Sequence, residues 1–351
     1  GHTPIALAGM TSIRDIDYSR DGTLVYVASA GGNGVTVLKR TANNELSVSQ
    51  VITKETKYLC GFVNNLPKFC AVGVMDAPYA LAVSPNDQQV YVASAGDGAL
   101  TVLQRSQADP NLLFYTQSFT ETINGVKVMD GAGDVLVSPD GKNVYVTARG
   151  SNSITVFTRS DNGRLSYLRS YSHGQDGISL LLWPGNMAIS PDGKFLYVPS
   201  YFSHGLTVFA RSDSDGSLQL VQGISGLTGA FSVAISHDPA GERLLLTLYD
   251  GDRMLLYARN EKSGELTFVE DYTQASNPNF AMPTRLATSA DDRNVYVAMS
   301  EGQGIQAFAS QRKQPVLANL SPASAVVGSG DLQLTVNGNN FYPESQIVWG
   351  G

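Results

Sequence analysis

The stretch VLVSPDGKNVYVTA, residues 135–148, decides the fold of this chain. It opens with a short apolar run that ends at Ser138. Pro139 and Gly141 then mark a β-turn, because proline fixes φ at the second turn position and glycine tolerates a left-handed conformation. Residues 144–147 (VYVT) alternate at period two, as a half-buried strand does. The stretch therefore predicts two short strands joined by a tight turn.

The same pattern occurs six times. A serine closes each apolar run: Ser19, Ser84, Ser138, Ser190, Ser236 and Ser289. In five repeats a tyrosine follows the serine after seven residues: Tyr26, Tyr91, Tyr145, Tyr197 and Tyr296. The fifth repeat has Leu245 instead, after nine residues. A large apolar residue follows after twelve more residues. Two positions after it, the first five repeats have an arginine: Arg40, Arg105, Arg159, Arg211 and Arg259. The sixth repeat has Ser310 there.

Each repeat predicts four short strands, and four-stranded units of ~40–50 residues that cannot bury both faces alone predict a β-propeller. The sixth repeat lacks its fourth strand, and residues 4–8 (PIALA) form an isolated apolar segment before the first repeat. Pairing this segment with the sixth repeat would cover a bare edge and close the ring. We therefore predict an all-β protein whose residues 3–312 form a six-bladed β-propeller closed by an N-terminal strand, with seven blades as the alternative.

The repeats LAVSPNDQQVYVAS, VLVSPDGKNVYVTA and MAISPDGKFLYVPS resemble the YVTN-type repeats of propellers related to the 6-phosphogluconolactonase-like group. The resemblance implies seven blades, from which the count of six departs. It also implies a histidine just before the first strand of a repeat, in a Pro-His context. None of the matching positions is histidine: they read Pro78-Tyr79, Gly133-Asp134, Asn186-Met187, Phe231-Ser232 and Thr284-Arg285.

Residues 313–351 differ from the repeats. Their Ser-Pro turn, their glycine-rich turn and the alternating Leu332, Leu334 and Val336 resemble the opening of an IPT/TIG immunoglobulin-like domain. About half of such a domain is present, so we expect a partial Ig-like segment that continues in the native chain. The alternative is a C-terminal tail packed on the propeller.

The composition favours a protein outside the cytoplasm, in the periplasm, secreted or at the cell surface. Charged residues make up 16% of the chain, below the ~25% typical of soluble domains. The 24 Lys and Arg against 31 Asp and Glu give a net charge of −7, which argues against nucleic-acid binding because that needs a basic stripe. No apolar run approaches the ~18 residues of a membrane helix.

Cys60 and Cys70 lie in an insertion between the first two repeats, residues 57–72. In an oxidising compartment they would form a disulfide, and the alternative is two unrelated buried thiols. Two thiolates without a nearby histidine leave zinc short of its four ligands, so we predict neither a metal site nor a cofactor.

Propellers bind ligands at one mouth of the central channel, where the loops after the second strand meet the loops that enter the first strand. The entering loops contribute Asp76, Pro78, Tyr79, Asp130, Asp134, Trp183, Asn186, Phe231, Pro283 and Arg285. From this rim we select as candidate ligand-binding residues Arg149, Tyr201, His204, Asp250, Arg285 and Glu301. Arginine offers a planar fork to a carboxylate or phosphate, although rim charges are often solvated loop residues.

The sequence favours a non-enzymatic scaffold that binds a protein or a glycan, flanked by further Ig-like domains of the same chain. The alternative is a lactonase-like hydrolase acting on a small anionic or sugar lactone, with His204 as the candidate catalytic residue beside Arg149, Arg285 and Glu301. A lone loop histidine is also commonly structural. A redox or metal propeller is a third possibility, but it lacks the His and Cys ligand set.

Overall fold

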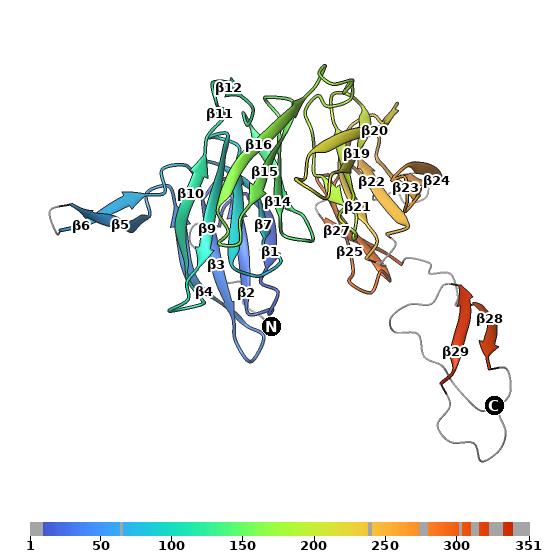
Figure 1. The fold of residues 1–351 in the computed structure, drawn as a ribbon, viewed down its shortest axis with the longest axis horizontal. Coiled ribbons are helices and arrows are strands. Elements are labelled where there is room, and N and C mark those ends of the chain that lie inside the picture. Colours follow the sequence, from blue (N-terminus) through green and yellow to red (C-terminus); the bar gives the residue numbers. More distant parts are fainter. Residues whose placement is uncertain are drawn as a thin grey trace, which may run out of the picture.

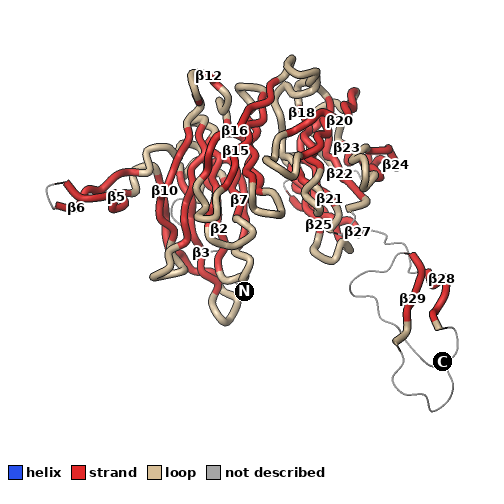
Figure 2. Tube along the Cα trace, in the orientation of Figure 1, coloured by secondary structure: helices blue, strands red, loops and turns tan. Residues whose placement is uncertain are grey.

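The computed structural model describes residues 10–63, 66–237, 241–273, 280–301, 304–309, 316–322 and 333–339. Within these ranges all regular structure is β-strand, as Figure 2 shows. None of these residues belongs to a helix long and apolar enough to span a membrane. Likewise, no group of His, Cys, Asp and Glu in the described ranges is arranged to hold a metal ion.

The repeats form six antiparallel sheets, the blades, which follow one another in chain order from blue to orange in Figure 1. Blade 1 contains β1 (Ile13–Tyr18), β2 (Leu24–Ser29), β3 (Gly34–Arg40) and β4 (Leu46–Thr53). Blade 2 contains β7 (Pro78–Val83), β8 (Gln89–Ser94), β9 (Ala99–Arg105) and β10 (Leu113–Phe119). Blade 3 contains β13 (Ala132–Val137), β14 (Asn143–Ala148), β15 (Ser153–Arg159) and β16 (Leu165–Ser172).

Blade 4 contains β17 (Ala188–Ile189), β18 (Phe195–Ser200), β19 (Gly205–Arg211) and β20 (Leu218–Ser225). Blade 5 contains β21 (Ala230–Ile235), β22 (Arg243–Leu248), β23 (Arg253–Arg259) and β24 (Leu266–Thr273). Blade 6 has three strands in the described residues, β25 (Pro283–Thr288), β26 (Asn294–Met299) and β27 (Gly304–Ala309). The predicted six-bladed, all-β arrangement is confirmed. The predicted closing strand, residues 4–8, lies outside the described residues.

The repeated serine fixes the turn between the first two strands of a blade. The hydroxyl of Ser138 accepts a hydrogen bond from the Asn143 amide at 3.0 Å and donates one to Asp140 at 2.6 Å. Ser19 does the same with Leu24 and Asp21. Because the hydroxyl satisfies backbone groups inside a buried turn, its recurrence is structural.

The repeated tyrosine and arginine join neighbouring blades. Tyr145 of blade 3 is fully buried, and its hydroxyl donates to the Gly216 carbonyl of blade 4 at 2.8 Å. Arg211 of blade 4 donates to the same hydroxyl from Nε at 2.9 Å. Arg159 of blade 3 donates to Tyr91 of blade 2 at 2.8 Å. Each such pair ties two sheets together at the end of the channel opposite the predicted rim, and we call it the Tyr–Arg latch.

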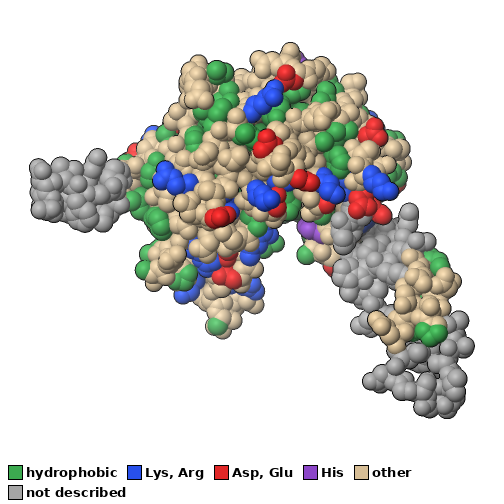
Figure 3. Space-filling model, viewed as in Figure 1, with side chains coloured by type: hydrophobic (Ala, Val, Ile, Leu, Met, Phe, Trp, Pro, Cys, Tyr) green, Lys and Arg blue, Asp and Glu red, His purple; other side chains and the backbone are tan. Residues whose placement is uncertain are grey.

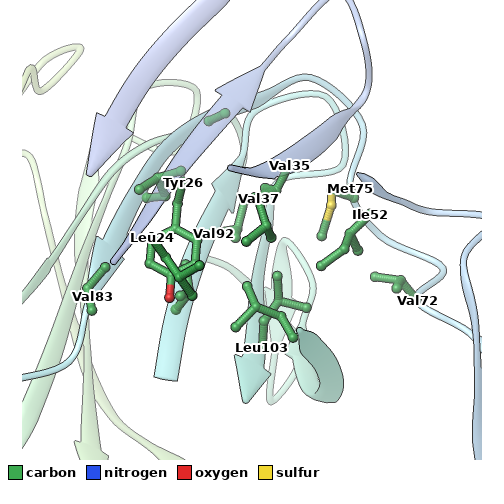
Figure 4. Packing of buried hydrophobic residues seen from close by; sticks show 14 residues of the cluster. Leu24, Tyr26, Val35, Val37, Ile52, Val72, Met75, Val83, Val92 and Leu103 are labelled. Carbon is green, nitrogen blue, oxygen red and sulfur yellow. The ribbon is translucent and has the colours of Figure 1, made fainter. Parts of the chain in front are cut away.

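The core lies between the faces of adjacent blades. Figure 4 shows the packing between blades 1 and 2, where Tyr26, Val37 and Val92 meet from facing sheets. These side chains alternate along their strands with residues of the opposite face, so each blade buries one face against each neighbour. Positive and negative side chains are interspersed on the surface in Figure 3.

The junction between blades 6 and 1 differs from the others. Arg285 of β25 forms an ion pair with Asp15 of β1 at 3.0 Å, which joins the inner strands. The apolar side chains farther along these faces are exposed: Ile16 by 58%, Tyr18 by 60% and Ile305 by 73%. Among the described residues, the apolar side chains named here at the junction of blades 6 and 1 are therefore exposed, whereas those between the other blades are buried.

Three two-stranded sheets lie outside the blades: β5 (Lys57–Val63) with β6 (Leu66–Ala71), β11 (Thr122–Ile123) with β12 (Val126–Lys127), and β28 (Val316–Ser321) with β29 (Thr335–Asn339). The β5–β6 hairpin projects from the blades in Figure 1 and carries Cys60 and Cys70 on its two strands. The cysteine side chains lie outside what the structure describes, so their pairing stays a prediction. Two strands do not establish an Ig-like domain, and that assignment also stays a prediction.

Candidate functional site at the channel mouth

The loops entering the inner strands meet the loops that follow the second strands at one mouth of the channel. The antiparallel meander requires this, because each first strand starts at the end where its second strand stops. Tyr79 and Phe231 are the second residues of β7 and β21, and Trp183 precedes β17. Arg149 follows β14 and Tyr201 follows β18.

Arg149 lies at the centre of this mouth, enclosed by aromatic rings. Its guanidinium carbon is 4.4 Å from the Tyr79 ring centroid, 4.5 Å from Trp183 and 5.6 Å from Phe231. Only 8% of the residue is exposed, and its Nε and Nη2 atoms are buried without a hydrogen-bond partner. Burial lowers the pKa of Arg149 from its ordinary value. Buried donors are nearly always paired, so these two N–H groups mark a place for an acceptor.

A glycine makes room for this arginine. A Cβ on Gly133 would lie 2.7 Å from Nε of Arg149, closer than real contacts allow. The next residue, Asp134, is 6% exposed. The charge of Asp134 acts on Arg149 and opposes the lowering of its pKa by burial.

Asp134 belongs to a polar layer across the channel. Its carboxylate accepts a hydrogen bond from the Met187 amide at 2.8 Å and one from the Asn186 side chain at 3.1 Å. Burial raises the pKa of Asp134 to about 6, against the opposing charge of Arg285. The side-chain oxygen of Asn186 is buried and has no partner. The layer lines a cavity of about 330 Å³, and its polar members there are Asp15, Asp134, Asn186, Ser232 and Arg285.

Aromatic residues form a wall beside Arg149. Trp183 lies 5.1 Å from Tyr201, and Tyr201 lies 6.2 Å from Tyr249, measured between ring centroids. The Tyr201 hydroxyl donates to Asp250 at 2.9 Å, and this bond together with burial raises the pKa of Tyr201 to about 12. The wall is half-buried, so it presents ring faces and edges to the mouth.

Tyr79 lies between two arginines, because Arg14 is 4.9 Å from its ring centroid on the side of blade 1. Burial raises the pKa of Tyr79, but the positive charges of Arg149, Arg14 and Arg285 outweigh it and the net direction is downward. The mouth therefore holds arginine side chains against aromatic rings.

The six predicted ligand-binding residues lie in separate parts of the structure. Arg149 lies in the aromatic enclosure, Tyr201 and Asp250 form one hydrogen-bonded pair, and Arg285 belongs to the polar layer. His204 is exposed, and its Nδ1 accepts a hydrogen bond from the Gly229 amide at 3.2 Å, which holds a loop. Among the described residues no contact joins His204 or Glu301 to Arg149 or Arg285. The predicted four-residue cleft is therefore not assembled by the contacts that the structure describes.

Of the polar layer, sequence reasoning selected only Arg285 for the candidate site. Its members occupy one register, four residues before the repeated serine: Asp15, Ala80, Asp134, Asn186, Ser232 and Arg285. Five of the six are polar at a position that faces the channel axis. That regularity is the signal that would have found them.

Curated relatives carry one activity name. A 6-phosphogluconolactonase of Formosa agariphila is 36% identical over 92 residues, 25% of this chain and 24% of that protein. A 6-phosphogluconolactonase of Photorhabdus laumondii is 26% identical and aligns over 62% of this chain and 65% of its own length. The chain thus spans less than two thirds of both. The 6-phosphogluconolactonase of Enterobacter sp. strain 638 is 20% identical, with 89% of this chain and 98% of that protein covered.

Solved structures share the fold. A putative 6-phosphogluconolactonase from Bacteroides uniformis has a TM-score of 0.58 and 18% identity, covering 74% of this chain and 70% of that one. The periplasmic gluconolactonase of Pseudomonas aeruginosa has a TM-score of 0.56 and 22% identity, covering 73% and 69%. At such identities the likeness shows the fold alone.

The expectation of a non-enzymatic binding scaffold, and with it the preference against an enzyme, is contradicted by the relatives and the family match, all of which carry lactonase names. That expectation rested on the missing histidine before the first strand. It overlooked that a buried carboxyl with a raised pKa also exchanges protons near neutral pH, and Asp134 occupies one of the positions inspected.

One family model, described as a lactonase with a seven-bladed β-propeller, matches residues 78–177 and 162–282. These matches cover more than half of the chain. They include Tyr79, Arg149, Trp183 and Phe231 of the aromatic enclosure, together with Asp134. The chain therefore belongs to the lactonase family of β-propellers.

Proposed function

We propose that this protein hydrolyses a small sugar lactone at the channel mouth. The observation that carries the proposal is Arg149, whose two unpartnered N–H groups are buried beside Asp134, a carboxyl with a pKa of about 6. Lactone hydrolysis needs donors for an oxyanion and a group that moves a proton. The family match and the names of the relatives favour the same reaction.

In this proposal Asp134 is the proton carrier. Near neutral pH its carboxylate takes a proton from a water molecule as the water oxygen bonds to the lactone carbonyl carbon. The carbonyl electron pair moves onto its oxygen, and Nε–H and Nη2–H of Arg149 stabilise that oxyanion. When the ring C–O bond breaks, the ring oxygen takes the proton from Asp134, and the product is an open hydroxy acid.

The remaining groups orient the substrate and tune the proton carrier. The ring faces of Trp183 and Tyr201 offer a surface for the apolar face of a sugar ring. Arg285 opposes the effect of burial on the pKa of Asp134, which keeps that pKa near the working pH. Arg14 adds a third positive charge, so a lactone with an anionic substituent is favoured over a neutral one.

The test is hydrolysis of glucono-δ-lactone and of its 6-phosphate, measured as acid release above the spontaneous rate. We expect Arg149→Met to lower kcat/KM by about 10²–10³-fold, the loss typical of an oxyanion donor. Arg169→Met is the matched control, because Arg169 also lies over a tyrosine ring, 4.9 Å from the Tyr171 centroid, but is exposed. Wild-type protein that releases acid no faster than buffer would remove the proposed function.

A location outside the cytoplasm is also proposed, on the low charged fraction and the cysteine pair. Cys60 and Cys70 lie on facing strands of the β5–β6 hairpin. We expect a disulfide between them, since oxidising compartments preserve such bonds. Thiol titration of the unfolded, unreduced protein should find no free thiol, and two free thiols per chain would contradict the pairing.

A further inference from the structure

The junction between blades 5 and 6 lacks the Tyr–Arg latch. At the earlier junctions the tyrosines Tyr26, Tyr91, Tyr145 and Tyr197 are all fully buried. The corresponding residue of blade 5 is Leu245, and the sequence has Ser310 where the following blade would supply its arginine. The phenol ring and the guanidinium are therefore lost together at one junction.

A cavity of about 410 Å³ occupies this junction. Leu245 and Met254 of blade 5 line one side, and Val295 and Phe308 of blade 6 line the other. Five polar residues line it as well: Ser236, Arg243, Glu270, Thr288 and Asp292. A cavity of ~300–1,000 Å³ with mostly apolar walls and a few polar groups is typical of a small-molecule site.

The other junctions show what this space accommodates. At two of them the buried tyrosine hydroxyl donates to a glycine carbonyl of the next blade, Tyr145 to Gly216 at 2.8 Å and Tyr197 to Gly264 at 2.9 Å. These glycines lie in the turns between the third and fourth strands. Blade 6 has no fourth strand in the described residues, and none of the described residues that line the cavity is a glycine. Leucine leaves the ring-sized space without burying an unpaired hydroxyl.

We propose that this cavity binds a small molecule with a phenolic ring, which takes the position of the missing tyrosine side chain. The apolar walls receive the ring, and Phe308 offers an aromatic face whose packing partners Tyr272 and Phe280 lie 6.1 and 5.7 Å away. Glu270, which also accepts from the Tyr272 hydroxyl at 3.2 Å, offers a carboxylate acceptor for the ligand hydroxyl, and Arg243 lines the same cavity. This site is separate from the channel mouth and does not depend on the proposed hydrolysis.

The probe is p-cresol, which has the shape of a tyrosine side chain, with toluene as the comparison that lacks the hydroxyl. We expect p-cresol to bind wild type in calorimetry and to raise its melting temperature, because a ligand that binds only the folded state stabilises it. Toluene should bind at least about tenfold more weakly, a difference of about 1.4 kcal/mol.

Leu245→Tyr fills the space and should weaken p-cresol binding at least tenfold. Leu112→Tyr, at an exposed position of blade 2, should leave binding unchanged. If Leu245→Tyr does not fold, as judged by circular dichroism, Met254→Trp fills the same cavity from β23 and decides the question. The proposal is overturned if wild type does not bind p-cresol, if the filled variant binds it as tightly, or if toluene binds equally well.

Discussion

Removing the charge of Asp134 should make the protein more stable at neutral pH. Burial raises the pKa of this carboxyl from 3.8 to about 6. The folded chain therefore holds this proton more tightly than the unfolded chain, so the contribution of Asp134 to stability is highest below pH 3.8 and is lost as pH rises through about 6. The difference corresponds to about 3 kcal/mol at about 1.4 kcal/mol per pH unit.

Asp134→Asn is the informative variant because it keeps the shape and removes the charge. The asparagine oxygen still accepts from the Met187 amide. Its NH₂ group faces Asn186, whose unpartnered side-chain oxygen becomes an acceptor after the amide rotates. We expect a gain of up to about 3 kcal/mol at about pH 8, no gain near pH 4, and a loss of about 10²–10⁴-fold in hydrolysis.

Urea unfolding followed by circular dichroism at both pH values measures the gain. Burial also raises the pKa of Asp15 and Asp17, so the pH dependence of wild type alone does not isolate Asp134, whereas the difference from the variant does. Asp213→Asn, at an exposed turn position, is the control and should change nothing. A variant that is less stable than wild type at about pH 8, or equally stable at both pH values, would refute the reasoning.

Two more variants test the parts of the structure separately. Gly133→Ala places a methyl group against the Arg149 guanidinium. We expect kcat in the hydrolysis assay to fall at least about tenfold while the chain stays folded. An unchanged kcat would show that the position of Arg149 does not matter for hydrolysis. Tyr145→Phe removes a buried hydroxyl that joins two blades and should lower the free energy of unfolding, measured in urea, by about 1–3 kcal/mol. Tyr296 is 42% exposed, so Tyr296→Phe should leave the free energy of unfolding almost unchanged. Equal losses in the two variants would argue against the latch.

The repeat predicted the fold because its recurring residues are structural. Ser138 closes a turn and Tyr145 joins two blades. The serine contact recurs at Ser84 and Ser190 and the arginine contact at Tyr91, so the spacing fixed the blades and the side of each turn. What the repeat did not settle is closure. The predicted closing segment, residues 4–8, lies outside the described residues, and it carries no repeat pattern that ties it to a particular sheet.

The site was predicted only in part, for a physical reason. Arg149 was selected as one of several charged rim residues among glycines and aromatics, and the structure places its guanidinium against the Trp183 ring. Asp134 did not stand out, because a carboxylate on an inner strand also has an ordinary structural use. Asp15 and Asp17 show that use, as each accepts a backbone amide from blade 2 at 2.9 Å. Asp134 also accepts a backbone amide, from Met187, and what sets it apart is its charge acting on Arg149, a proximity that the sequence does not give.

Two kinds of position in the repeat therefore have different uses: some make the same structural contact in each blade, and others face the channel and supply the candidate site. Where all blades need the same contact, the residue is the same, as with the serine that closes each turn. Where a position faces the channel or its mouth, each blade contributes one side chain to a shared space, and six copies of one residue would place like charges or like rings together. The positions equivalent to Arg149 accordingly read Ala30, Ala95, Arg149, Tyr201, Tyr249 and Ser300. A symmetric fold builds an asymmetric site this way, and the same argument applies at Leu245, where the tyrosine register varies and a cavity opens.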